Sequence, residues 1–120
     1  LGNATPSNGY GTPKSATVAA QLNQAVQKYG RTTKLTRGSV VGINATVDIG
    51  YSSGTARFVG QVIIRGSKPF SKSGDSGSLI VTYPGNNPVG LLFAGSSNGY
   101  TIANPIGDVL NAFGVTIDGQ

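Results

Sequence analysis

The alternation of apolar and polar residues along residues 41–49 constrains the fold more than any other feature of this sequence. The apolar positions are Val41, Ile43, Ala45, Val47 and Ile49, and the positions between them are Gly42, Asn44, Thr46 and Asp48. Successive side chains of a β-strand point to opposite sides, so a period of two indicates a strand with one buried face. We therefore predict a half-buried strand over residues 36–49.

Further short segments are rich in apolar residues and are separated by turn-forming residues. They cover residues 26–29, 55–65, 78–83, 89–95 and 100–103. Short strands at regular spacing predict a barrel or a sandwich. Asn104 and Pro105 suit the cap and the first position of a helix, and the apolar residues after them have helical spacing up to Gly114. The sequence thus predicts an all-β domain with a short C-terminal helix.

The first part of the chain differs in composition from the rest. Residues 1–20 are mostly small and polar and include prolines and glycines, which is typical of an exposed linker or arm. Residues 21–120 are then a single domain, large enough to bury a core. The chain begins with Leu1 and contains no methionine, so we expect a processed chain or a fragment. Exposed linkers are also where proteolytic cleavage concentrates.

Charge and composition exclude several classes of function. The net charge is +5, but the basic residues are scattered along the chain, so nucleic-acid binding is not expected. No apolar run approaches the roughly 20 residues that span a membrane, and no segment resembles a signal peptide. The chain has no cysteine, histidine or glutamate. We therefore expect no disulfide, no metal site and no cofactor.

The motif Gly74-Asp75-Ser76-Gly77-Ser78 stands directly before an apolar run. Glycines on both sides of a serine allow the backbone to turn sharply and to hold the hydroxyl away from the protein. Amides next to a glycine are also free of side-chain bulk, as donors to a developing oxyanion must be. A tight turn that opens a strand is the alternative interpretation, because Gly, Asp and Ser are common turn residues.

A second stretch, residues 30–47, resembles the hairpin that opens the C-terminal barrel of bacterial chymotrypsin-like (trypsin-like) serine proteases. Alpha-lytic protease and the streptogrisins are the members it resembles in motif. The Gly-Asp-Ser-Gly sequence lies about where this family has its nucleophile, and residues 90–95 resemble its substrate-binding strand. The resemblance implies a six-stranded antiparallel Greek-key β-barrel, which is one half of the double barrel.

The resemblance also implies roles for individual residues. Ser76 is the candidate nucleophile, and the amides of Gly74 and Ser76 are the candidate oxyanion hole. A peptide substrate would pair with the edge formed by Phe93, Ala94 and Gly95, and one wall of the primary specificity pocket would be Phe70, Ser71 and Lys72. This wall contains no acidic residue, which favours small or apolar side chains. Simple core packing is the alternative role for Phe70 and Phe93.

Asp75 should point inward beside an outward-facing serine, and a buried carboxylate must be paired. In the bacterial branch of the family an internal arginine is the partner, and Arg31 in Gly-Arg-Thr-Thr matches it. We therefore predict a structural ion pair between Asp75 and Arg31. The alternative is an Arg31 that only solvates the end of a strand.

The absence of histidine limits what the chain can do alone. A serine hydroxyl is a poor nucleophile without a positioned base, and in this family the base is a histidine oriented by an aspartate. Both would come from an N-terminal barrel. The first hypothesis is accordingly the nucleophile-bearing half of a serine endopeptidase.

Two further hypotheses are open at this point. The chain could be a catalytically inert, structural or self-associating protease-like domain. It could also be a different enzyme in which Lys72 or Lys34 activates Ser76, although a lysine base must be desolvated. The expected partner is an N-terminal barrel carrying His and Asp, or another copy of the chain. The sequence does not fix a location, and an extracellular one is implied only by the secreted bacterial relatives.

Overall fold

The computed structural model describes residues 9–14, 16–51, 53–66, 70–71, 75, 77–83, 85–95 and 99–113. Its strands and helix are, in chain order, β1 Ala25–Gly30, β2 Lys34–Tyr51, β3 Gly54–Gly66, β4 Leu79–Thr82, β5 Pro88–Gly95, β6 Tyr100–Pro105 and α1 Ile106–Phe113.

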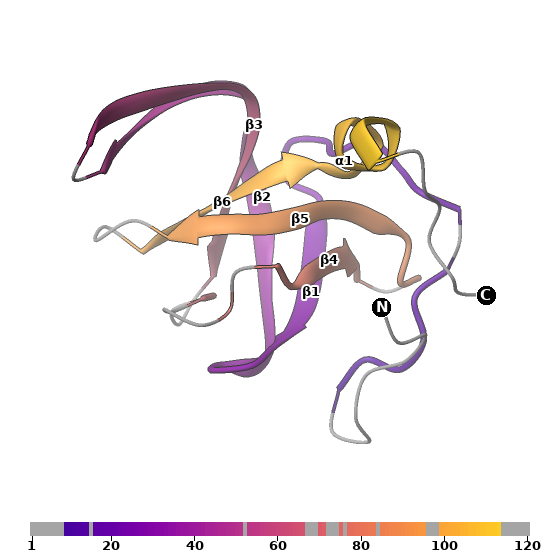
Figure 1. The fold of residues 1–120 in the computed structure, drawn as a ribbon. Coiled ribbons are helices and arrows are strands. Elements are labelled where there is room, and N and C mark those ends of the chain that lie inside the picture. The colour runs from indigo at the N-terminus through magenta and orange to yellow at the C-terminus, as the bar shows by residue number, and fades with distance from the viewer. Residues whose placement is uncertain are drawn as a thin grey trace.

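The strands close into one barrel in the order β1-β2-β3-β6-β5-β4 (Figure 1). All neighbouring strands are antiparallel. This confirms the predicted six-stranded antiparallel barrel with a short C-terminal helix. The described helix, α1, is too short to cross a membrane.

Aliphatic side chains from all six strands fill the barrel. The buried cluster consists of Val26, Val40, Val62, Ile64, Phe70, Ile80, Val89, Leu92 and Ala103. On β3 the buried residues Val62 and Ile64 share one phase, as a half-buried strand requires, whereas Val89 and Leu92 on β5 lie three residues apart. On β1 the inward phase begins with Val26 and continues through Lys28 to Gly30, all three of which are buried.

The predicted alternation on β2 is interrupted by bulges. Val40 is fully buried, but Val41 and Ile43 are 44% and 40% exposed, although the period of two placed them on the inner face. The register against β3 shifts between Val40 and Gly42 and again between Gly42 and Ala45. Each bulge adds a residue to one strand and changes which side chains point inward. Beyond the bulges, β2 and β3 continue as a hairpin that extends away from the barrel (Figure 1).

The described part of the N-terminal arm packs on the barrel instead of lying free of it. The amides of Lys14 and Val18 donate to the carbonyls of Asn86 and Pro88, at 2.9 and 3.0 Å. The side chain of Asn86 donates to the carbonyl of Tyr10 at 3.1 Å. Val18 and Ala20 pack against the core cluster, Pro13 is buried, and burial raises the pKa of Tyr10. Lys14, Ala16, Thr17 and Ala19 of this arm are exposed, and the composition of residues 1–20 gives no sign of the long-range hydrogen bonds.

Replacing Asn86 should release this arm. Asn86 has a φ of 59°, so Asn86→Gly keeps the backbone conformation and removes only the side-chain hydrogen bonds to the arm and to Gln27. We expect a loss of unfolding free energy of about 1–2 kcal/mol. Hydrogen exchange at the Lys14 and Val18 amides should rise with it, whereas unchanged exchange there would show that the arm is held by other contacts.

Candidate functional site

Asp75, Gly77 and Ser78, the described residues around the predicted nucleophile, are called the serine turn below, and this turn is bonded to β5. Ser76, Gly74 and Lys72 lie outside the described residues, but Asp75 and Gly77 on either side of Ser76 are described. The amide of Gly77 donates to the carbonyl of Leu92 at 2.8 Å, and the amide of Leu92 donates to the carbonyl of Ser78 at 2.9 Å. These bonds hold Gly77 and Ser78 beside Leu92, the residue that precedes Phe93.

The turn is also closed on itself. The amide and the hydroxyl of Ser78 both donate to the carbonyl of Asp75, at 3.1 and 2.6 Å. Gly77 has a φ of 88°, which an L side chain adopts only with strain. The second glycine of the motif is therefore required by the backbone of the turn.

The predicted substrate edge lies at the same end of the barrel. Phe93 and Ala94 are half-buried, and Gly95 is exposed and pairs with Thr101 of β6. The hydroxyls of Ser71 and Thr101 are 2.6 Å apart. A side-chain carbon on Gly95 would meet the Ser71 hydroxyl at 3.5 Å. The structure thus brings Ser71 and Gly95, two of the predicted substrate-binding residues, together.

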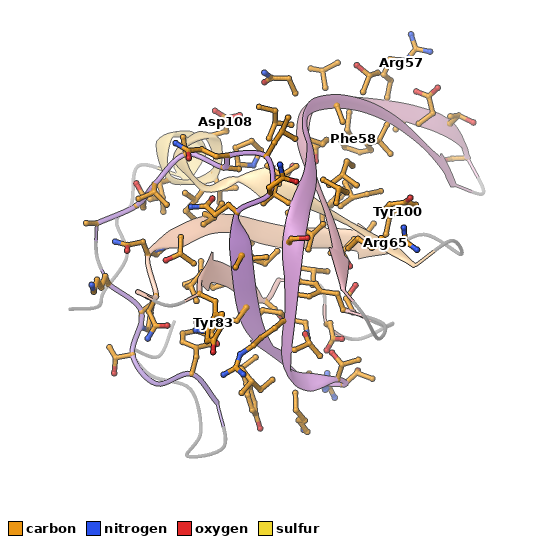
Figure 2. All side chains as sticks on the ribbon, turned by 180° about the vertical axis from the view of Figure 1, so that it is seen from behind. Arg57, Phe58, Arg65, Tyr83, Tyr100 and Asp108 are labelled. Atoms are coloured by element: carbon orange, nitrogen blue, oxygen red, sulfur yellow. The ribbon has the colours of Figure 1, made fainter. Side chains whose placement is uncertain are left out.

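Two aromatic contacts border this edge. The ring of Phe58, on the β2–β3 hairpin, packs edge-on against Phe93 with 4.6 Å between ring centroids. The guanidinium of Arg65 lies 5.6 Å from the ring centroid of Tyr100 (Figure 2). The sequence did not indicate a role for Phe58 at this edge, because its contact with Phe93 depends on how the β2–β3 hairpin bends.

Phe70 belongs to the core. Its side chain is 1% exposed and is a member of the buried cluster. This favours the core-packing alternative for Phe70 over direct contact with substrate. Its carbonyl accepts a hydrogen bond from the Thr36 hydroxyl at 2.7 Å, which ties the segment before the serine turn to β2.

Asp75 is fully buried, as predicted, but its partner is not Arg31. One carboxylate oxygen accepts from the amides of Thr32 and Thr33 at 2.7 and 3.1 Å. The other accepts from the Thr33 hydroxyl at 2.6 Å and lies 3.9 Å from the ammonium of Lys28. Both charged side chains of this ion pair are fully buried.

The predicted pair between Asp75 and Arg31 is wrong because of the shape of the β1–β2 turn. Arg31 opens this turn, and its side chain is exposed, while the amides of the next two residues point toward Asp75. Lys28 instead has the inward phase of Val26 on β1. The spacing of two residues between Val26 and Lys28 was the sequence signal for a buried lysine. A lysine in a strand nevertheless suggests a solvated side chain.

The environment of Lys28 changes its acidity. Its ammonium donates to the Thr33 hydroxyl at 2.5 Å and to the Lys34 carbonyl at 3.1 Å, and it lies 5.3 Å from the centroid of the Phe70 ring. Burial lowers the pKa of Lys28 to about 8, although the charge of Asp75 acts in the opposite direction. The ammonium is therefore titratable near neutral pH, unlike that of an exposed lysine.

Gly30 makes room for the carboxylate. A side-chain carbon at Gly30 would lie 2.3 Å from a carboxylate oxygen of Asp75. Atoms cannot approach this closely, so any other residue at position 30 would displace Asp75. The glycine that ends β1 is accordingly part of the support beneath the serine turn.

Lys34 is not placed as a desolvated base. Its side chain is exposed, and its ammonium donates to the carbonyl of Arg31 at 3.0 Å. A lysine can act as a base only where it is removed from water. Of the two lysines considered as activators of Ser76, the described one therefore lacks the necessary environment.

A cavity of about 490 Å³ opens between the arm, the bulged part of β2 and β3, and α1. Its lining includes Val18, Ile43 and Ile106, and none of the predicted site residues. It therefore adds nothing to the serine turn or to the substrate edge.

No family model matches this sequence. Among curated proteins, Streptogrisin-A of Streptomyces griseus is 38% identical over 102 residues, which are 82% of this chain and 32% of the relative. Glutamyl endopeptidase 2 of the same species is 33% identical over 115 residues, which are 92% of this chain and 56% of the relative.

Solved structures of bacterial proteases are similar as well. A glutamic-acid-specific serine protease that uses a histidine triad in substrate binding has a TM-score of 0.71 at 31% identity and covers 89% of this chain. A chymotrypsin of Cellulomonas bogoriensis has a TM-score of 0.70 at 29% identity and also covers 89% of this chain. The matches take up 55% and 56% of those two chains, so this chain spans about half of their length.

The buried lysine predicts how stability depends on pH. The unfolded chain holds the Lys28 proton with the ordinary pKa of 10.5 and the folded chain with a pKa of about 8. Between these values the unfolded state binds more protons, so stability rises with pH. We expect the unfolding free energy to increase by roughly 2–3 kcal/mol from about pH 7.5 to about pH 10, measured relative to Lys28→Met.

The matched control for this prediction is Lys14→Met, which removes an exposed lysine. Denaturant unfolding of this variant should follow the pH dependence of the wild type. If Lys28→Met shows the same slope as the wild type, Lys28 is not buried with a lowered pKa.

Proposed function

Because this chain is homologous to bacterial chymotrypsin-like serine proteases over 32–56% of their length, as expected for their C-terminal barrel, we propose that it is the nucleophile-bearing half of a serine endopeptidase. In this proposal Ser76 attacks the peptide carbonyl and forms an acyl-enzyme, and the amides of Gly74 and Ser76 stabilise the oxyanion. The observation that carries it is the anchoring of Gly77 and Ser78 to Leu92, directly before the substrate edge.

The chain lacks the rest of the catalytic machinery. It contains no histidine, and a serine needs a base to lose its proton during attack. In our proposal a histidine oriented by an aspartate is supplied by an N-terminal barrel that packs against this one. The N-terminal barrel is therefore the proposed partner, and the complete site would lie between the two barrels.

The proposed substrate is a peptide that adds a strand to the edge at Phe93, Ala94 and Gly95. Ser71 lies beside Gly95, and together with Lys72 it would border the pocket for the side chain before the cleaved bond. We propose that this pocket takes a small or apolar side chain. A histidine triad like that of the glutamic-acid-specific relative cannot come from this chain, which has no histidine.

The isolated chain should be almost inert toward fluorophosphonate probes and peptide esters. Without the base, only oxyanion stabilisation and binding are left, which are worth roughly 10³–10⁴ over water. Labelling should be measured by intact mass, with Ser76→Ala as the blank. Rapid labelling of Ser76 in the isolated chain would contradict the proposal and would point to a base within these 120 residues.

The converse experiment joins this chain to an N-terminal barrel of the family that carries the histidine and the aspartate. The folded protein should then react with the probe at Ser76, and Ser76→Ala should abolish the reaction. A folded double barrel that stays unlabelled would favour the inert, structural alternative.

A further inference from the structure

The two charges beneath the serine turn are linked through a hydroxyl. The ammonium of Lys28 is 3.9 Å from the nearer carboxylate oxygen of Asp75, which is too far for a hydrogen bond. The Thr33 hydroxyl lies within hydrogen-bond distance of both groups, at 2.5 Å from the ammonium and 2.6 Å from the carboxylate. A hydroxyl can accept one hydrogen bond and donate another at the same time. Thr33 is thus placed to join Lys28 to Asp75.

Among the described residues, the carboxylate of Asp75 is the charged group that faces Lys28. The side chains of Arg31 and Lys34, on the neighbouring turn, are exposed. The strand residues that pair with Lys28 are Thr36 on β2 and Ile80 on β4, and both are neutral. The Phe70 ring also faces the ammonium. The protonation of Lys28 therefore depends mainly on its burial and on Asp75.

Asp75 transmits this state to the turn. Its side chain is held by the β1–β2 turn, whereas its own carbonyl accepts both hydrogen bonds from Ser78. If Lys28 loses its charge, the attraction that helps to hold the Asp75 carboxylate in place is lost. The bonds from Gly77 and Ser78 are then the first ones that can open.

We propose that Lys28, acting through the Thr33 hydroxyl, is a positioning residue for the serine turn, and that loss of its proton releases the turn while the barrel stays folded. The role in catalysis rests on the proposed function of Ser76, but the conformational change does not. An arginine in this place would stay charged at all relevant pH values. The lysine makes the position of the turn sensitive to pH as Lys28 loses its proton.

The direction of the pH effect follows from how tightly Lys28 holds its proton when the turn is closed and when it is released. When the turn is released, Lys28 stays in the barrel wall, bonded to the Lys34 carbonyl, but loses the attraction of Asp75. The released state therefore holds the proton less tightly than the closed state, and rising pH favours release. Global unfolding has the opposite sign, because an unfolded lysine holds its proton more tightly. The two processes can thus be separated by pH alone.

The test is hydrogen exchange by NMR on the 120-residue chain, with each rate divided by the rate expected for an unfolded peptide. Protection of the Gly77 and Ser78 amides should fall by up to about tenfold per pH unit as the pH rises toward the pKa of Lys28 in the closed turn, and should level off above it, since one proton is involved. The Asn23 amide, which donates to Val40 in the barrel wall, should keep its protection.

Variants decide whether Lys28 is the cause. Lys28→Arg should keep the turn protected over the whole pH range, and the exposed control Lys14→Arg should behave as the wild type. If Lys28→Arg does not fold, Thr33→Val serves instead, because removal of the linking hydroxyl should lower protection at all pH values and flatten the pH dependence.

Two results would overturn the proposal. One is an equal loss of protection in the wild type and in Lys28→Arg, or, where Thr33→Val is used instead, a pH dependence in Thr33→Val as steep as that of the wild type. The other is a Lys28 resonance that titrates while Gly77 and Ser78 stay protected. Because no catalytic measurement enters, failure of the proposed protease activity would leave this test intact.

Discussion

The buried ion pair between Lys28 and Asp75 is the interaction on which the rest of this site depends. Removing an ammonium and a carboxylate from water costs several kcal/mol for each ion unless hydrogen bonds and mutual attraction offset it. Here Asp75 accepts bonds from Thr32 and Thr33, and Lys28 donates to Thr33 and to the Lys34 carbonyl. The tight β1–β2 turn and the absence of a side chain at Gly30 are needed for this geometry.

The serine turn is held by contacts within this one barrel. Its flanks are bonded to β5 through Leu92, and its buried acid is held by β1 and by the turn that follows. In the proposed protease the second barrel would add the base to a turn that is already in place. The described residues beside Ser76, Asp75 and Gly77, are thus held by contacts within this barrel alone.

The short strands could be predicted from local patterns in the sequence, which left a barrel or a sandwich open, and the resemblance to the protease family selected the barrel. The cation beneath Asp75 could not be predicted, because its identity depends on which residues of the β1–β2 turn point inward. Arg31 is nearer to the expected motif, but the phase set by Val26 selects Lys28. The bulges of β2 exposed Val41 and Ile43 for a similar reason, since a strand pattern does not show where an extra residue shifts the phase.

A double-mutant cycle of Lys28→Met and Asp75→Asn tests the central claim most directly. Each single variant leaves a buried group without its partner, and the double variant removes both charges. For contacts within one network, we predict a coupling free energy above about 1 kcal/mol near pH 7, obtained from the unfolding free energies of the four proteins. Additive effects, with a coupling indistinguishable from zero, would show that the two groups do not stabilise each other, and would contradict this account of the serine turn.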